Sequence, residues 1–419
     1  MSSLNDSLLK RLKAVECRDS TYAAKEPSLV MATGKGSLVF DADGNEFIDL
    51  CAGFGALALG HHPEAHLEIY RTRLGSGPAP VNHAMGDVYP SVAKVELIEA
   101  LAVMLPKELS RIALALTGAQ AVELAVKTAI LATKRSGFIV FQGGYHGLDL
   151  GILPLTTRAD FRTPFENYAS LDVVEILPFQ ASPAELSAGA DRLTGRGLGL
   201  AGILVEPVQG RAGVRPAGTP WLKALRAFAD ERNALLIYDE VFSGLGRTGK
   251  VTQSTEVPAD LVCLGKALGG GFPLSACAGT RAAMDAWPES SGEALHTGTF
   301  FGHPFSCEIA KATLAELARE SLAARALELG EQALSWLQTA LSKHPIVKEV
   351  RGEGLMLGIE FHESGAGARL MDQLRGHGVI ALCAGEKGEV LSITPALNIS
   401  WELLLQALAK IVHCVSLTR

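Results

Sequence analysis

The chain has 419 residues, 48% of them hydrophobic and 20% charged, and its formal net charge is −7. This composition is typical of a globular protein with a large core, and it argues against a disordered or fibrous chain and against nucleic acid or an anionic membrane as a partner. The seven cysteines show no C-x-x-C spacing, which favours buried reduced thiols in a cytoplasmic protein over disulfides or a zinc site.

The amino-terminal segment predicts a short amphipathic helix, because Leu4, Leu8 and Leu12 recur at helical spacing. It lacks the basic stretch followed by an apolar stretch that marks a secretory signal. The sequence contains no run of about 18 uncharged apolar residues, so no membrane span is predicted. Residues 37–50 then predict two short strands around an Asp-Gly turn.

Short apolar runs alternate with amphipathic helical patterns between residues 90 and 310. This alternation is typical of a parallel sheet that helices cover on both faces. We therefore predict an α/β protein with a large domain at 58–310 and a small α+β domain built from residues 1–57 and 311–419. The runs predicted as strands of the large sheet are 112–116, 138–141, 200–205, 234–238 and 261–264, and the clearest strand pair of the small domain spans 347–360.

Ligands of such sheets bind outside the carboxyl ends of the strands, so the polar residues that follow each strand are the candidates for a site. The first strand is followed by Thr117, Gly118 and Ala119 and then by a helical pattern. Small residues at this turn would let backbone N–H groups bind a phosphate, although a tight connection has the same pattern. The turn has no P-loop lysine and no G-x-G-x-x-G, which disfavours nucleoside triphosphates and dinucleotides.

Three further strands each end at a polar or aromatic residue. Tyr145 and His146 lie between glycines and could stack on and hydrogen-bond to a planar ring, or Tyr145 could simply pack in a turn. Glu206 precedes a proline, a position where a carboxylate often ties a loop to a neighbouring cation. Asp239 ends a buried strand, where an ionised carboxylate needs a cation such as a protonated pyridine nitrogen. A metal is the rival partner, but no His or Cys cluster lies nearby in the sequence, and no metal site is predicted.

Lys266 follows the last of these strands and precedes the glycine-rich turn 269–271. Burying an ammonium is costly unless it is paired or deprotonated, and a neutral amine is a nucleophile suited to forming a Schiff base. A strand-end lysine that points to solvent is the alternative. Lys266 lies one helix-and-strand unit after Asp239, so both are expected on adjacent strands at one edge of the sheet. A phosphate turn, an aromatic residue, an aspartate and a lysine together describe a pyridoxal phosphate site.

The chain resembles the class III, fold type I pyridoxal-phosphate aminotransferases over nearly its whole length. The most specific segments are Asp-Glu-Val-Phe-Ser-Gly-Leu-Gly-Arg-Thr-Gly-Lys at 239–250 and Leu-Gly-Lys-Ala-Leu-Gly-Gly-Gly-Phe-Pro at 264–273. The resemblance implies a mostly parallel, seven-stranded type of sheet in the large domain. It also implies a ping-pong transfer of an amino group from an amine or amino acid, of an ω- or non-standard kind, to an oxo acid. An aminomutase or an amino-acid racemase on the same scaffold is the alternative, and a descendant without activity would have lost Lys266 or its supports.

Residue by residue, the resemblance implies that Lys266 forms the Schiff base with pyridoxal phosphate and moves the substrate proton, and that Asp239 keeps the pyridine nitrogen protonated. Val241 and Tyr145 would pack on the two faces of the ring. Thr299 would bind the phosphate held by the neighbouring subunit, which implies a homodimer with two shared active sites. The remaining cofactor-binding positions implied are Gly118, Ala119, His146 and Glu206.

Three positions depart from the 4-aminobutyrate and acetylornithine members of the family. Leu148 stands where those members have an arginine that binds a substrate carboxylate. Ser392 aligns with a second arginine, and Arg211 aligns with the glutamate that pairs with this second arginine. We hypothesise that Arg211 recognises an acidic group on one substrate or pairs with Glu206. Glutamate or 4-aminobutyrate specificity is therefore not expected.

Two phenylalanines are further candidates for the substrate pocket. Phe242 stands where many relatives have a glutamine that contacts the ring hydroxyl, which suggests a drier pocket and a less polar amine. Phe54 lies between two glycines near the junction with the small domain. It is either a wall of the pocket or an ordinary core residue.

Overall fold

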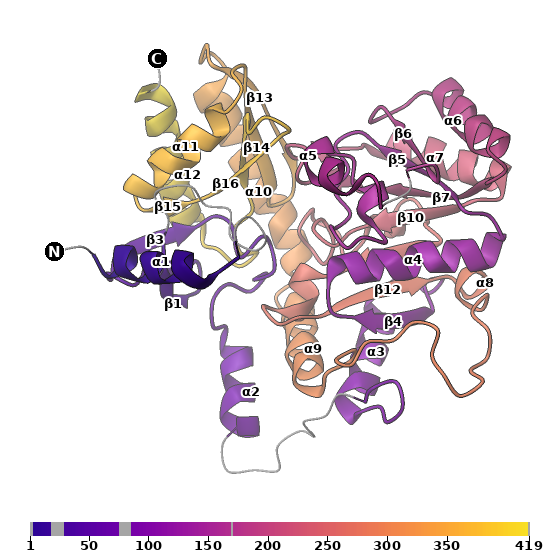
Figure 1. The fold of residues 1–419 in the computed structure, drawn as a ribbon. Helices are drawn as coiled ribbons and strands as arrows, with labels where there is room; N and C mark the ends of the chain where they lie inside the picture. The colour runs from indigo at the N-terminus through magenta and orange to yellow at the C-terminus, as the bar shows by residue number, and fades with distance from the viewer. Residues whose placement is uncertain (1–2, 18–28, 75–84, 169–170, 418–419) are drawn as a thin grey trace.

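The computed structural model describes residues 3–17, 29–74, 85–168 and 171–417. Figure 1 shows two lobes side by side, a larger one around a seven-stranded sheet and a smaller one in which the indigo amino-terminal strands lie next to the yellow carboxyl-terminal helices. Within the described ranges, no helix combines the length and the apolar character that crossing a membrane requires.

The large sheet has the strand order β4-β12-β11-β10-β7-β5-β6. Six of its strands run parallel to one another, and β12 runs antiparallel to both of its neighbours. The prediction of a mostly parallel sheet is confirmed, and each predicted strand lies within a residue or so of an observed one. The strands are β4 (Arg111–Ala115), β5 (Gly137–Phe141), β6 (Val174–Leu177), β7 (Leu200–Val205), β10 (Leu235–Asp239), β11 (Leu261–Leu264) and β12 (Ser275–Gly279).

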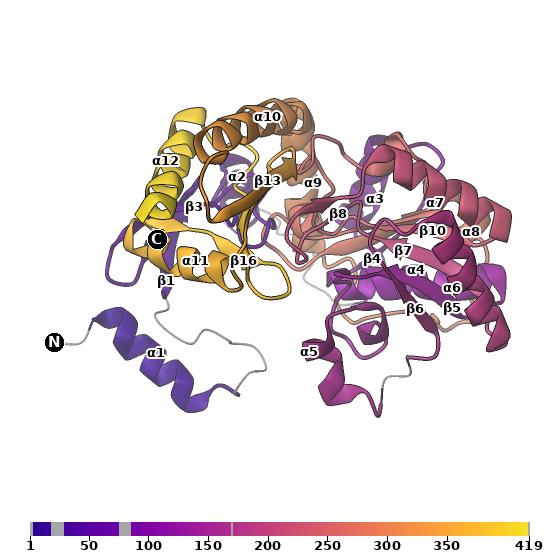
Figure 2. The ribbon, with the colours of Figure 1, turned by 90° about the horizontal axis from the view of Figure 1, so that it is seen from above.

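Successive side chains of these strands enter two separate cores, one on each face of the sheet. In β10, Ile237 packs in the first core, whereas Leu236 and Tyr238 pack in the second. Both faces are dry, which explains why the strands are continuous apolar runs. Figure 2 shows α4 and α7 on opposite faces. The first core is covered by α4 (Gly118–Thr133) and α8 (Arg281–Met284), and the second by α3 (Val92–Met104), α6 (Pro183–Gly195), α7 (Thr219–Arg232) and α9 (Pro304–Arg319).

Helix α4 begins directly after β4 because of a capping box. The Thr117 hydroxyl accepts a hydrogen bond from the Gln120 backbone N–H at 3.2 Å, and the Gln120 side chain accepts one from the Thr117 N–H at 3.3 Å. These bonds satisfy groups that a helix end otherwise leaves open and fix where the helix starts. The amino-terminal end of α4 is thereby held at the carboxyl edge of the sheet.

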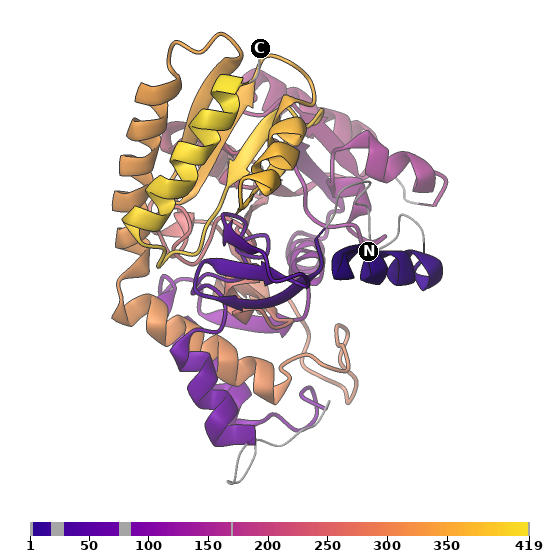
Figure 3. The ribbon, with the colours of Figure 1, turned by 90° about the vertical axis from the view of Figure 1, so that its left-hand side faces the viewer.

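The smaller lobe joins the two ends of the chain through the parallel pairing of β15 with β3. Figure 3 shows its carboxyl-terminal helices covering its sheets. The predicted hairpin at 37–50 and the strand pair at 347–360 are both confirmed. One sheet contains β1 (Met31–Lys35), β2 (Leu38–Asp41), β3 (Glu46–Asp49) and β15 (Val379–Ile380), and the other contains β13 (Val347–Glu353), β14 (Met356–Phe361), β17 (Val390–Ile393) and β16 (Leu382–Ala384).

The remaining elements are the amino-terminal helices, the helices of the carboxyl-terminal part and several short helices, strands and turns. The predicted amino-terminal helix is present as α1 (Leu4–Val15). The domain boundaries at 57/58 and 310/311 stay a prediction. The other elements are α2 (Glu64–Leu74), α5 (Ala159–Arg162), β8 (Val208–Gln209), β9 (Arg215–Pro216), α10 (Leu322–Leu341), α11 (Ala366–Gly376), α12 (Trp401–Leu417) and the 3-10 turns Leu153–Leu155, Thr163–Phe165, Gln253–Thr255 and Lys266–Gly269.

Candidate active site

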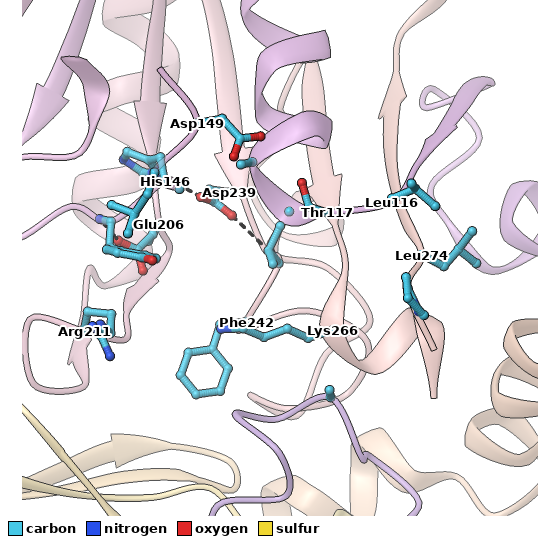
Figure 4. Close-up of a pocket in the computed structure, with 18 of the residues that line it drawn as sticks. Leu116, Thr117, His146, Asp149, Glu206, Arg211, Asp239, Phe242, Lys266 and Leu274 are labelled. Atoms are coloured by element: carbon cyan, nitrogen blue, oxygen red, sulfur yellow. Dashed lines mark hydrogen bonds and ion pairs between the residues drawn. The ribbon is translucent and has the colours of Figure 1, made fainter. Parts of the chain in front are cut away.

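A cavity of about 470 Å³ opens at the carboxyl edge of the large sheet. Its walls come from the turns that follow β4, β5, β7, β10 and β11, as the close-up in Figure 4 shows. Strand ends far apart in the sequence therefore meet at one place, as expected for parallel strands. The predicted site residues that line the cavity are Gly118, Ala119, Tyr145, His146, Glu206, Arg211, Asp239, Val241, Phe242 and Lys266.

Three predicted site residues do not line this cavity. Phe54 has 49% of its surface exposed, so it is not a core residue either. Ser392 is buried in β17, opposite Gly358 of β14. Thr299 is exposed, in a turn after α8. A single chain therefore brings together most of the predicted site residues, but not these three.

Lys266 begins the tight turn after β11 and points into the cavity, not outward from the strand end as in the alternative reading. Its backbone φ is +42°, a left-handed conformation that costs a residue other than glycine free energy. Its Nζ lies 3.6 Å from the centre of the Phe242 ring. Burial lowers the pKa of Lys266 to about 8, although the negative charges of Asp239 and Glu206 oppose the shift. The amine therefore loses its proton far more readily than an exposed lysine does, with a midpoint near pH 8.

The Phe242 ring is held at both of its edges by backbone. A Cβ added at Gly210 would lie 2.5 Å from Cδ1 of this ring, and one added at Gly55 would lie 2.6 Å from Cε2. Both distances are far below a normal contact, so only glycine allows this close approach. The position of the ring over the Lys266 amine is thus set by the backbone, and its face can stabilise a positive charge there.

Asp239 is fixed at the end of β10 by two hydrogen bonds. Its Oδ2 lies 2.8 Å from Nδ1 of the buried His146, and its Oδ1 accepts from the Val241 backbone N–H at 3.1 Å. In this pair Nδ1 of His146 can donate a hydrogen bond to the carboxylate. In turn, the His146 backbone N–H donates to Thr156 Oγ1 at 2.9 Å. Lys266 follows β11, the parallel neighbour of β10, as the sequence predicts.

Glu206 ties two loops of the site together through backbone amides. Its Oε1 accepts from the Tyr145 N–H at 2.9 Å and its Oε2 from the Gly210 N–H at 3.0 Å. Burial raises the pKa of Glu206 to about 7. The hypothesised pairing of Glu206 with Arg211 is not found among the described residues. The two backbone amides donate to the Glu206 carboxylate instead.

The turn before α4 can hold an anion. The N–H groups of Gly118 and Ala119 are in the first turn of the helix, where no carbonyl of the helix can accept from them. A Cβ added at Gly118 would lie 2.7 Å from Cγ1 of Val241, so the glycine lets Val241 approach the turn. Asp239 and Lys266 lie beside this anion site in the same cavity. These residues fit a planar ring that carries a phosphate, an aldehyde and a basic nitrogen, as pyridoxal phosphate does.

Some residues of the site were not predicted. Phe272, Pro273 and Leu274 line the cavity, and their place directly after the glycine-rich turn is a signal that could have identified them. Ala56 also lines it, without a signal in the sequence. Phe161, in the short helix α5, packs edge-on against Tyr145 at 5.8 Å. It follows no predicted strand, so a search of strand ends misses it.

Comparison with known proteins gives consistent results. The family described as "Aminotransferase class-III" matches residues 21–415. An acetylornithine aminotransferase of Methanopyrus kandleri is 35% identical over 343 residues, which cover 81% of this chain and 82% of that protein. The 5-aminovalerate aminotransferase DavT of Pseudomonas putida is 33% identical over 438 residues, with 99% of both chains covered.

Solved structures give the same picture. The ornithine aminotransferase of Toxoplasma gondii, crystallised in the presence of oxidised glutathione, has pyridoxal phosphate at partial occupancy in its active site. It matches with a TM-score of 0.85 and 26% identity, over 98% of this chain and 94% of that one.

Proposed function

The chain belongs to the class III aminotransferases, which use pyridoxal phosphate, and we propose that it transfers an amino group from an ω-amino acid or another non-standard amine to an oxo acid. The observation that carries this proposal is the meeting of Lys266, Asp239 and the amino-terminal end of α4 in one cavity. The apolar side chains of Leu148 and Phe242 in the cavity wall favour an aliphatic donor over glutamate.

We assign the roles of the residues from their positions. When it is bound, pyridoxal phosphate supplies an electron sink for the substrate Cα. Lys266 would bond to the cofactor and carry the proton to and from that carbon. Asp239, oriented by His146, would keep the ring nitrogen protonated. Val241 and Tyr145 would flank the ring, and the backbone N–H groups of the α4 turn would hold the phosphate.

Absorbance in half-reactions tests the overall function. A donor such as 5-aminopentanoate alone should remove the absorbance band of the lysine-bound cofactor, and an oxo acid such as pyruvate should restore it. Transamination predicts this because each half-reaction changes the form of the cofactor. A band that persists with every amine, while the enzyme still interconverts isomers of an amino acid, would contradict the proposal and indicate a racemase or an aminomutase.

Uptake of pyridoxal phosphate by the apoenzyme should become faster as the pH rises toward about 8 and then level off. Burial lowers the pKa of Lys266 from its usual 10.5 to about 8, and only the unprotonated amine can attack the aldehyde. Stopped-flow absorbance over a pH series measures the rate. The variant Phe242→Ala opens the amine to water and should move the midpoint toward 10.5. An identical midpoint in both proteins would contradict the role of burial.

We further infer a homodimer in which each active site uses Thr299 of the other subunit. Two observations support it. Thr299 is exposed and lies outside the cavity of its own chain, and the neighbouring Phe300 has 52% of its surface exposed. This segment is tied to a second one with exposed apolar residues, because Thr297 Oγ1 donates to Asp87 Oδ2 at 2.6 Å next to Val88, which is 63% exposed. Exposed apolar side chains on segments that are tied together often lie in protein interfaces.

Mixed dimers should recover activity that neither parent has. A homodimer of Lys266→Ala would be inactive because both sites lack the reactive lysine. A homodimer of Thr299→Glu would be inactive because the glutamate repels the cofactor phosphate at both sites. If the sites are shared, a hybrid dimer keeps one complete site, so random mixing should restore about a quarter of the wild-type activity. Co-expression with two affinity tags isolates the hybrid. An inactive hybrid would contradict sharing through Thr299.

We also infer a cytoplasmic location. None of the cysteines in the described part of the chain forms a disulfide. Five of them are buried, at positions 51, 263, 277, 307 and 414, where they act as small apolar side chains. Reduced thiols of this kind fit a reducing compartment.

A further inference from the structure

Arg211 brings a positive charge to the cavity without a partner for it. The side chain lines the cavity and is half-buried. Its Nε is buried and has no hydrogen-bond acceptor among the described residues. A buried donor that is left without an acceptor costs free energy, so native structures rarely keep one without a reason.

The guanidinium is held in place by two aromatic rings. Its carbon lies 5.1 Å from the centre of the Tyr145 ring and 6.0 Å from that of Phe161. Stacking occupies the faces of the group and leaves its N–H edges available in the plane, where a carboxylate can bind through two hydrogen bonds. The backbone is fixed as well, since Arg211 lies in the loop between β8 and β9 and its carbonyl accepts from Gly385 N–H at 2.9 Å. The cation is therefore positioned before any ligand arrives.

The carboxylates of the cavity are engaged elsewhere. Glu206 accepts from two backbone amides, and Asp239 accepts from His146 and from a backbone amide. Asp149, the third carboxylate in the wall, is exposed to water. The charge of Arg211 also disfavours the protonated form of Lys266. Within the described residues, the positive charge of Arg211 is therefore left for a ligand to neutralise.

The cofactor phosphate is not that ligand. Figure 4 shows Arg211 on the far side of the cavity from Thr117, with Asp239, Phe242 and Lys266 between them in the view. The anion site at α4 and the guanidinium are thus two separate anion-binding positions, one on each side of the reactive lysine. The wall between Lys266 and Arg211 includes the ring of Phe242, which suits an aliphatic chain.

We propose that Arg211 binds the carboxylate of the donor, so that the substrate is an amino acid whose amine reaches Lys266 while its carboxylate pairs with the guanidinium across an aliphatic chain. This inference rests on the proposed transamination.

A comparison of matched amines tests the proposal in the half-reaction. 5-Aminopentanoate and pentylamine have the same chain and differ in the carboxylate. In the holoenzyme, Arg211→Met should raise the concentration of 5-aminopentanoate that gives half the maximal rate by about 10- to 100-fold, as expected for lost charge-assisted hydrogen bonds. The maximal rate itself should change little, and the pentylamine curve should not move. Arg211→Lys should give an intermediate loss of affinity for 5-aminopentanoate, because lysine keeps the charge but lacks the paired N–H donors of the guanidinium.

Arg158→Met is the matched control. Arg158 also stacks on Phe161, at 4.8 Å, but it pairs with its own carboxylate, Asp160, and does not line the cavity. Its loss should leave both amine curves unchanged. Calorimetry with pentanoate, which cannot react, gives a second measurement, and binding should weaken at least about 10-fold in Arg211→Met only.

The outcomes separate this inference from the function on which it rests. An equal loss with both amines in Arg211→Met would show that Arg211 only supports Tyr145, and an unchanged 5-aminopentanoate curve would show that it does not contact the donor. Either result overturns the inference and leaves transamination standing. A wild-type enzyme whose cofactor band survives every amine overturns the transamination itself.

Discussion

Lys266→Ala should lower kcat by at least about 10³-fold and abolish the absorbance band of the lysine-bound cofactor. Alanine can neither bond to the aldehyde nor carry a proton at the substrate Cα. The amine of Lys266 is prepared for both tasks, because burial brings its pKa to about 8 and the Phe242 ring lies against it. Absorbance of the purified variant and steady-state kinetics measure the two effects separately.

The control for this variant is Lys250→Ala. Lys250 is also partly buried, but it pairs with Glu353 at 2.9 Å and does not line the cavity. Its replacement should leave the cofactor band intact and activity near that of the wild type. Added methylamine should restore part of the lost rate in Lys266→Ala, since a free amine can carry the missing proton. A variant that keeps its band or its turnover would refute the assignment of Lys266.

The central sheet could be predicted because most of its strands are buried on both faces. Such strands are continuous apolar runs, and β7 (Leu200–Val205) and β11 (Leu261–Leu264) coincide with the predicted runs. Two strands were not predicted. β12 is Ser-Ala-Cys-Ala-Gly, and its small residues do not form an apolar run. β6 lies at the edge of the sheet, where its Glu175 pairs with Arg192 and interrupts the apolar pattern.

The parts of the site whose positions depend only on the order of the strands could be predicted. Asp239 and Lys266 end adjacent parallel strands, so the sequence was enough to bring them together. Contacts that depend on loops were not predictable. The pairing of Arg211 with Glu206 was a reasonable hypothesis from charge, but Glu206 is satisfied by backbone amides, and no sequence pattern shows which acceptor a buried donor meets. The role proposed for Thr299 involves a second chain, which a single sequence indicates only through resemblance.

Asp239→Ala should lower kcat by about 10²- to 10⁴-fold while the cofactor stays bound to Lys266. In the proposed role, the carboxylate would stabilise a proton on the ring nitrogen, and that positive charge would draw electrons from the substrate Cα. Without the carboxylate, the ring nitrogen would be neutral and the electron sink weak. The loss should appear in the half-reaction with donor alone, because proton removal from Cα is the step that needs the sink.

Glu240→Gln is the matched control, because Glu240 is the next residue and is also buried. Its carboxylate points away from the cavity, toward Thr252 and the Gln253 N–H. Burial raises the pKa of Glu240 to about 7, so it is already partly protonated near neutral pH and its neutral replacement should change kcat little. Equal losses in the two variants would mean that Asp239 acts on the fold and not on the ring.

Rescue by a modified cofactor separates charge from shape. Pyridoxal phosphate methylated at the ring nitrogen carries a permanent positive charge that needs no carboxylate to maintain it. In Asp239→Ala the smaller side chain leaves room for the methyl group, so this cofactor should restore most of the lost half-reaction rate. In the wild-type enzyme it should do no better than pyridoxal phosphate, since Asp239 would already keep the ring nitrogen protonated and its side chain would crowd the methyl group. If the methylated cofactor fails in Asp239→Ala but still binds to Lys266, the contribution of Asp239 is not the charge on the ring, and the electrostatic role assigned to the end of β10 is wrong.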